Sequence, residues 1–172
     1  MRYSYHSHNS YYSHRYIMRK KRVYKKFYEA DLKFERIDIG RFINYVMEEG
    51  KRSIAERIVY DAFDSIQAKT KEDPAKVFDK ALENASPLLE IKARRIGGAT
   101  YQVPREVSPK RRVALGLRWM INGARSKTGK PMAAKLAEEI ILAAKNEGMA
   151  IKRKSDMHRM AEANKAFAHF AW

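Results

Sequence analysis

The sequence predicts a mainly α-helical fold, a bundle of about six helices with one protruding β-hairpin between the third and fourth helices. Three observations favour this class. Apolar residues recur at helical spacing along most of the chain, residues typical of helix ends separate these stretches, and the pattern changes once, around Gly97-Gly98. The chain has 172 residues, of which 45% are hydrophobic. This is enough for one domain with a hydrophobic core and too short for two.

The amino-terminal residues have no helical pattern. Residues 1–17 are a low-complexity mixture of tyrosine, serine and histidine, and we expect a disordered extension, with Met18 a candidate for the true start. Residues 18–28 interleave six lysines and arginines with aromatic residues. They are either a solvated charged tail or an arm that lies on phosphates, with Tyr24 and Phe27 stacked on bases. We favour the arm, because these aromatics have no clear core to serve.

Three helices are expected next, at the start of a single domain over 18–172 whose helical core covers 37–172. The first is capped by Asp38, stops at Gly50 and has one apolar face, formed by Ile39, Phe42, Ile43, Val46 and Met47. The second opens with a capping box, Ser53 and Glu56, and its apolar stripe is Ile54, Ile58, Ala62 and Ile66. The third starts at Asp73-Pro74, ends before Pro87 and buries Val77, Phe78, Ala81, Leu82 and Ala85.

The hairpin is expected at about residues 88–104. β-Branched and aromatic residues lie on both sides of Gly97-Gly98, and glycine supplies the positive φ that a tight reversal needs. The segment is short and basic and has a proline near each end, so we expect it to project as an arm. Arg94 and Arg95 offer forked donors that suit phosphate. The alternative is an ordinary turn with surface arginines.

Three further helices complete the expected bundle. One starts at Ser108-Pro109, with its inward residues Val113, Leu117, Met120 and Ile121. The next starts at Pro131 and is closed by Gly148 as a carboxyl-terminal cap, with Met132, Leu136, Ile140 and Ala144 inward. The last begins near Ser155 or Asp156 and carries Met157, Met160, Ala161, Phe167 and Ala168.

The net charge of +16 is concentrated in particular segments. Residues 1–28 carry eight bases and no acid, and residues 91–112 carry seven bases and one acid. Residues 29–90, by contrast, carry ten bases and fourteen acids. Because folding does not require such an excess, its concentration indicates a binding face for a polyanion, first of all a nucleic acid.

No pattern of residues indicates catalysis. The SKTGKP stretch at 126–131 fails as a phosphate loop, since Ala124 stands where its first glycine is needed and Pro131 where a hydroxyl should bind magnesium. The only histidines in the carboxyl-terminal part, His158 and His169, are too far apart on one helix for a shared metal, so we interpret them as packing residues. Glu48-Glu49 and Glu138-Glu139 are interpreted as solvated helix charges.

We therefore expect no enzyme, no cofactor, no metal site and no small-molecule substrate. The chain has no cysteine, which excludes disulfides and thiolate metal sites. No apolar run is long enough to span a membrane, and the first residues lack the apolar region of a secretory signal.

Four stretches together resemble a known family. EEGKRSIAERIVYDA, ALENASPLLEIKARRIGGATYQVP, SPKRRVALGLRW and HRMAEANKAFAHFAW, in this order and spacing, are similar to the bacterial-type small-subunit ribosomal protein seven family. The resemblance covers roughly residues 18–172, and residues 1–17 have no counterpart in it. It implies a primary binder of the 3′ major domain of small-subunit ribosomal RNA that nucleates head assembly.

The resemblance also implies partners. They are the exit-site transfer RNA, the messenger RNA, the eleventh small-subunit ribosomal protein and neighbouring head proteins, in the small ribosomal subunit of the cytoplasm rather than of an organelle. Some members of the family repress translation of their own messenger RNA.

RNA-facing residues of the family correspond to five basic stretches of this sequence. The implied contacts are Lys20, Lys21, Arg22, Lys25 and Lys26 of the arm; Lys51 and Arg52 after Gly50; Arg94, Arg95, Gly97, Gly98 and Tyr101 of the hairpin; Lys110, Arg111, Arg112 and Arg118; and Lys152, Arg153, Lys154 and Arg159.

Two other functions share the basic charge. A DNA-binding architectural or regulatory protein would insert a helix into a major groove. A membrane-surface protein would use the basic arm on anionic lipid, but its helices would then need apolar faces beyond those that the core requires. We expect no membrane partner.

Overall fold

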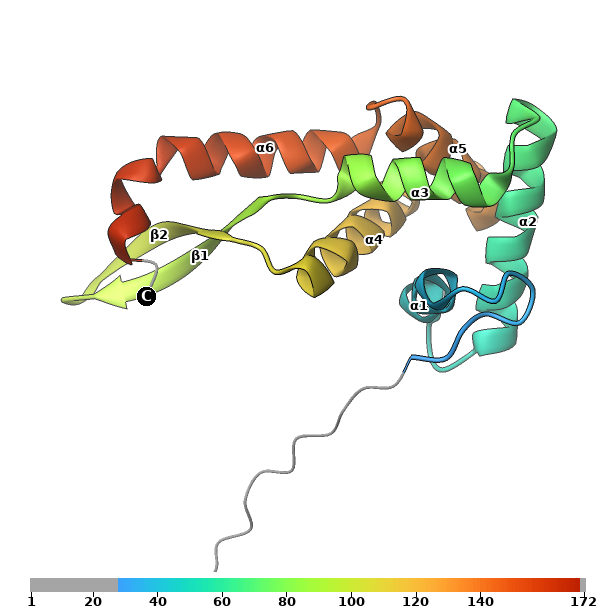
Figure 1. Cartoon of the computed structure of the whole chain (residues 1–172), viewed down its shortest axis with the longest axis horizontal. Helices are drawn as coiled ribbons and strands as arrows, with labels where there is room; N and C mark the ends of the chain where they lie inside the picture. The colour runs from blue at the N-terminus through green and yellow to red at the C-terminus, as the bar shows by residue number, and fades with distance from the viewer. Residues whose placement is uncertain (1–27, 171–172) are drawn as a thin grey trace, which may run out of the picture.

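The computed structural model describes residues 28–170 and confirms the mainly helical class with one hairpin (Figure 1). The elements are α1 (Ile37–Val46), α2 (Arg52–Thr70), α3 (Pro74–Ala85), β1 (Leu89–Ile96), β2 (Ala99–Glu106), α4 (Pro109–Ser126), α5 (Met132–Ala144), α6 (Met149–Ala163) and the short 3-10 helix η1 (Lys165–Phe170). The expected extension 1–17 and the arm up to residue 27 lie outside the described residues. Within 28–170, none of the helices combines the length and the apolar character that a membrane span requires.

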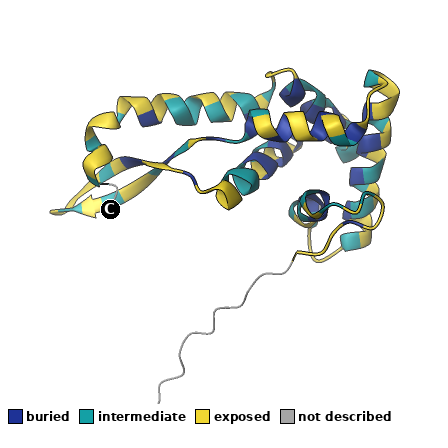
Figure 2. Ribbon diagram, viewed as in Figure 1, coloured by how far each residue is buried: buried dark blue, intermediate teal, exposed yellow. Residues whose placement is uncertain are grey.

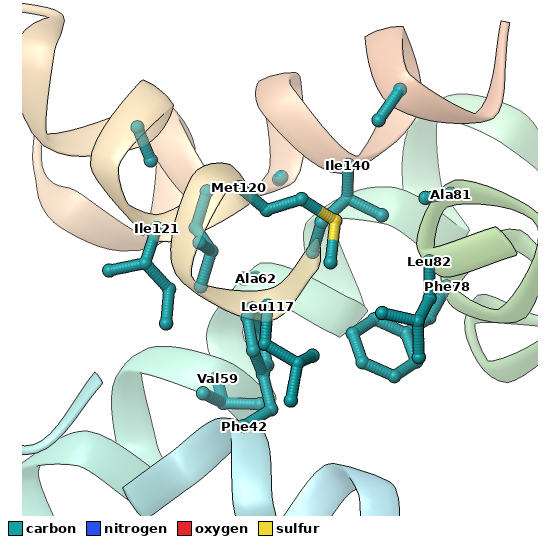
Figure 3. Close-up of a cluster of buried hydrophobic side chains, with 14 of the residues drawn as sticks. Phe42, Val59, Ala62, Phe78, Ala81, Leu82, Leu117, Met120, Ile121 and Ile140 are labelled. Atoms are coloured by element: carbon teal, nitrogen blue, oxygen red, sulfur yellow. The ribbon is translucent and has the colours of Figure 1, made fainter. Parts of the chain in front are cut away.

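The core lies where α1 to α5 meet. Phe42, Phe63 and Phe78 come from three different helices and are fully buried, with ring centroids 5.1 Å apart for Phe42 and Phe78 and 5.7 Å apart for Phe63 and Phe78. Figure 3 shows Phe42 and Phe78 within the same cluster, in which Leu117 and Met120 of α4 face the same interior as Ile140 of α5. These five helices form the helical body of the molecule, and the hairpin extends from it.

The hairpin and α6 extend together away from this body. In Figure 1 both strands and α6 reach the side opposite α2, and η1 folds back against β2. Figure 2 shows that this extension is mostly exposed or half-buried, unlike the helical body. The predicted hairpin is therefore confirmed, but it is accompanied by the last helix along its length and does not project alone.

The start of α3 confirms one helix signal of the sequence. The Asp73 carboxylate accepts a hydrogen bond from the Ala75 amide (3.0 Å), Pro74 occupies the first helical position, and all five predicted core residues of this helix are buried. The helix ends at Ala85, two residues before Pro87, as expected.

The starts of α1 and α2 differ from the prediction. The first helix begins at Ile37, so Asp38 lies inside its first turn and is not the cap. The second begins at Arg52, so the capping box was wrong. Arg52 Nε donates instead to Glu56 Oε1 (2.8 Å) one turn on, and Ile54, placed on the buried stripe by the prediction, is 52% exposed.

The boundary between α5 and α6 also differs from the one that the sequence predicted. α5 starts after Pro131 as expected, but Gly148 does not close it. Gly148 has φ of 92° and immediately precedes Met149, the first residue of α6. The last helix thus begins six residues before Ser155 and includes the whole basic stretch from Lys152 to Lys154. It ends at Ala163, so Phe167 and Ala168 belong to η1.

Glu139 was predicted to be a solvated helix charge, and this was wrong. Its side chain is 0% exposed, Oε1 accepts a hydrogen bond from the Ala150 amide (3.0 Å), and Oε2 lies 2.9 Å from the Lys127 amine. A Cβ on either Gly123 or Gly148 would collide with this carboxylate. The buried charge therefore joins the loop after α4 to the first turn of α6.

Candidate nucleic-acid interface

All but one of the described candidate residues occupy two regions. The hairpin region comprises Arg94, Arg95, Gly97, Gly98, Tyr101, Lys110, Arg111, Arg112, Lys152, Arg153, Lys154 and Arg159, which lie on the hairpin, the first turn of α4 and α6. The α2 region comprises Lys51 and Arg52, at the start of that helix. The remaining described candidate, Arg118, lies on α4 over the Tyr45 ring of α1. The five candidates of the arm, Lys20, Lys21, Arg22, Lys25 and Lys26, lie outside the described residues.

Three consecutive cations occupy the first turn of α4. Lys110, Arg111 and Arg112 follow Pro109, and no acid shares this turn. The amino terminus of a helix carries a partial positive charge, so cations are disfavoured there and anions are favoured. Such a placement is costly for folding. Glu90 of β1 offsets the cost for Arg111, and an external anion such as a phosphate would relieve what remains.

Two basic residues, Arg112 and Lys154, face the junction between α4 and α6. Burial lowers the pKa of Lys154, and the nearby positive charge of Arg112 lowers this pKa further. The Lys154 amine donates to the backbone carbonyl of Asn84 (2.6 Å) and is half-buried. The Glu83 carboxylate acts in the opposite direction and raises this pKa, so the junction carries two bases and one acid and keeps an excess of positive charge.

The expectation that the two histidines are packing residues is supported. His158 Nε2 accepts a hydrogen bond from the Leu88 amide (3.1 Å), which ties α6 to the start of the hairpin. Burial, and then the charge of Lys154, lowers the pKa of His158, so the neutral acceptor form is favoured. His169 packs against Phe170 with ring centroids 3.9 Å apart. Among residues 28–170 there is no group of three side chains suited to hold a metal.

Arg94 and Arg95 lie on opposite faces of the hairpin, because neighbouring strand residues alternate. Arg94 is directly opposite Tyr101 in the register, and Arg95 is opposite Thr100. The Tyr101 ring packs against Phe167 (5.2 Å between centroids) and Phe170 (5.7 Å), so η1 occupies part of its surface. The two arginines therefore cannot clamp one phosphate from the same side.

The turn of the hairpin matches the sequence argument. Gly97 and Gly98 have φ of 56° and 90°, as a two-residue turn of this hand requires. A Cβ on either would meet no atom of residues 28–170 within 4 Å. The glycines are thus needed for backbone conformation and leave the tip open on its outer side.

On α6, Lys152 and Arg153 are exposed. Arg159, one or two turns further, is 81% exposed and reaches Asp156 Oδ1 (3.0 Å) on its own helix. The basic stretch that the sequence placed before a helix is therefore part of one continuous helical surface alongside the hairpin.

In the α2 region the cations have acidic partners. Lys51 lies 2.7 Å from Glu49, and the hydrogen bond from Arg52 to Glu56 raises the pKa of Arg52. Arg118 of α4 has an aromatic partner instead, the Tyr45 ring of α1, whose centroid is 5.4 Å away. The exposed ion pairs of Lys51 and Arg52 exchange partners at small cost, so these two cations remain available to phosphate.

Sequence reasoning missed two residues of the hairpin, Glu90 of β1 and Arg105 of β2. Glu90 is buried, and it contacts Arg105 across the hairpin and Arg111 of α4. One signal was available: Glu90 is the only acid between Glu83 and Glu106, in an otherwise cationic stretch. An isolated acid among bases on a strand indicates an internal partner for one of them.

Similarity to known proteins agrees with a basic surface of this kind. A family model described as "Ribosomal protein S7p/S5e" matches residues 16–165. The chain is similar to proteins named "Small ribosomal subunit protein uS7". The protein of Thermotoga maritima is 55% identical over 155 residues, covering 90% of this chain and all of the relative. That of Endomicrobium trichonymphae is 58% identical over 144 residues (84% and 91%), and that of Moorella thermoacetica is 53% identical over 154 residues (90% and 99%).

Proposed function

Because the chain belongs to the S7p/S5e family of ribosomal proteins, we propose that it is a primary binder of the 3′ major domain of small-subunit ribosomal RNA. It is a structural constituent of the small ribosomal subunit, and the family is structural rather than enzymatic. The proposal extends this role to nucleating assembly of the head and to contributing to the exit site for transfer RNA and to the messenger path.

One observation supports RNA binding most directly. The first turn of α4 carries three consecutive cations, and one of them, Arg112, acts on Lys154 of α6 as a like charge. Glu90 and Glu83 offset only part of this positive charge, and a polyanion would relieve the rest. Since the cations come from different elements, they match an RNA surface whose phosphates are arranged in three dimensions.

The geometry favours folded RNA over duplex DNA. The cations are spread over a hairpin, a helix start and the side of a second helix, and no single exposed helix carries them. The A-form major groove is too deep and narrow for side chains to read, so recognition there depends on phosphates, shape and unstacked bases. The proposed partners beyond ribosomal RNA are exit-site transfer RNA, messenger RNA, the eleventh small-subunit protein and neighbouring head proteins, all in the cytoplasm.

The test is filter binding of the full chain to a transcript of the 3′ major domain, with duplex DNA as competitor. If about six cations engage phosphates, log affinity falls with log salt at a slope of about −4 to −5. Duplex DNA that competes as well as the transcript would overturn the proposal and favour the architectural DNA-binding function.

Paired variants locate the interface. Arg112→Gln with Lys154→Gln should weaken binding and make the salt slope shallower by about 1–2. The matched control is Lys69→Gln with Lys76→Gln, which removes the same charge from exposed positions outside the candidate residues. Equal losses in both pairs would mean that only total charge matters and that the junction is not the binding site.

A further inference from the structure

We propose that Glu90 is a positioning residue that holds Arg105 and Arg111 in the orientation in which they grip an RNA phosphate. The inference rests on the proposed RNA-binding function and deepens it by naming a contact, Arg105, that the family resemblance did not supply. Glu90 does not touch the RNA in this account, and it acts through the two arginines.

Glu90 is placed between the hairpin and α4. It is only 4% exposed, although a carboxylate is normally solvated. Its Oε2 accepts a hydrogen bond from Arg111 Nε in the first turn of α4 (2.5 Å). Its Oε1 lies 3.7 Å from Nε of Arg105, the residue directly opposite on β2, and accepts no hydrogen bond within residues 28–170.

The charges of this cluster do not cancel. One buried carboxylate faces two guanidinium groups, so the cluster keeps a charge of +1 on its outer side. Arg105 and Arg111 are 45% and 47% exposed, so both side chains reach solvent while their inner edges are held. A carboxylate needs only one arginine for neutralisation, and the second indicates an additional anion in the working complex.

The contacts with Glu90 leave the terminal nitrogens of each guanidinium group available to a phosphate. Both contacts to Glu90 use Nε, which is one of five N–H donors of a guanidinium. The terminal nitrogens form the fork that fits a phosphate. Holding the side chains in advance reduces the conformational entropy that binding would otherwise remove.

A purely structural role for Glu90 makes different predictions. As a simple link between hairpin and α4, Glu90 would contribute to stability only. Its replacement by a neutral residue would then strengthen RNA binding slightly, because the net charge rises by one. A positioning role predicts the opposite sign: weaker binding in spite of the added positive charge.

The experiment compares Glu90→Gln with Glu106→Gln in the full chain, using the 3′ major domain transcript over a range of salt. Glu106 is exposed on β2 of the same hairpin, so the control removes the same charge. For Glu90→Gln we expect about tenfold weaker binding, as for one lost charge-assisted hydrogen bond, and a salt slope shallower by about 1–2. Glu106→Gln should bind as tightly as the unaltered chain or slightly more tightly.

Two outcomes decide the question. Weaker binding and a shallower slope for Glu90→Gln alone, with Glu90→Asp recovering part of both, support the inference. A folded Glu90→Gln chain that binds like Glu106→Gln overturns this inference alone. If the unaltered chain shows no preference for the transcript, the proposed function falls and this inference falls with it, so the two failures are distinguished by the unaltered chain.

A second variant guards against misfolding of Glu90→Gln. Arg111→Lys keeps the charge and the aliphatic stem but removes Nε and the fork. It should weaken binding about as much as Glu90→Gln does, and Lys76→Arg, the reverse exchange at an exposed position outside the candidate residues, should not. Unchanged binding by Arg111→Lys would overturn the inference whatever the fate of Glu90→Gln.

Discussion

The buried pair of Glu139 and Lys127 predicts an unequal response to losing either partner. Glu139 is 0% exposed, whereas the Lys127 side chain is 26% exposed. A lysine without its partner turns to water, but a carboxylate without its partner stays in the interior. We therefore expect Lys127→Met to be more harmful than Glu139→Gln, although each removes one charge from the same pair.

The magnitudes follow from the contacts. Glu139→Gln keeps an oxygen for the Ala150 amide and loses one charge-assisted contact, which should lower the free energy of unfolding by about 1–2 kcal/mol. Lys127→Met leaves a buried charge with that amide as its remaining contact, at a cost of about 3–5 kcal/mol. The double variant should return close to Glu139→Gln alone, since the stranded charge is then gone.

Urea unfolding at neutral pH measures these differences, provided that the m-value is unchanged. Lys130→Met is the control, because Lys130 pairs with the exposed neighbour Glu138 and its loss should have little effect. If Lys127→Met costs no more than Glu139→Gln, or if the double variant is the least stable of the three, the argument from unequal burial is refuted.

Three further predictions concern packing and protonation. Gly40→Ala places a Cβ 2.5 Å from the Glu29 carbonyl oxygen, so thermal unfolding should report a loss of about 1–2 kcal/mol; an unchanged melting temperature would contradict this contact. His158 has a lowered pKa, so the unfolded chain takes up protons first, and stability should fall as the pH drops below about 6.5; His158→Gln should flatten this fall, and an equally steep fall in that variant would exclude His158 as its cause. Burial raises the pKa of Tyr60 to about 12, so its stabilisation is complete below pH ~10 and is lost towards pH ~12; unfolding of Tyr60→Phe should depend less on pH in that window, and identical profiles would refute the assignment.

The helices with both a clear start signal and a regular apolar face were predicted well. α3 is the best example, because Asp73, Pro74 and the buried face are all encoded within a dozen residues. α6 was predicted too short, since Lys152 to Asp156 looks like a polar linker. This stretch is helical because Ala150 and Ala161 pack against other elements, and because the Glu139 carboxylate accepts a hydrogen bond from the Ala150 amide in the first turn. Those contacts are separated in sequence, so periodicity cannot reveal them.

The candidate site shows the same division. The positions of the basic stretches were readable from charge, and the hairpin turn from Gly97-Gly98. What the sequence did not show is which cations share a face. Arg94 and Arg95 are neighbours in sequence but lie on opposite faces of the hairpin, while Arg112 and Lys154 are far apart in sequence and the charge of Arg112 still lowers the pKa of Lys154. The burial of Glu90 likewise could not be predicted, because its partners Arg105 and Arg111 come from β2 and α4.

The pairing of α6 with the hairpin has a consequence for the order in which the chain opens. Only Ala150 and Ala161 of α6 are buried, in contrast to six buried residues in each of α3 and α5. Amide hydrogens in this distal half should therefore exchange through local opening, at lower free energy than those of the central helices. RNA bound over both elements would suppress their local opening and selectively slow the exchange of their amide hydrogens. This half of the molecule would then be more stable in the assembled ribosomal subunit than in the free polypeptide.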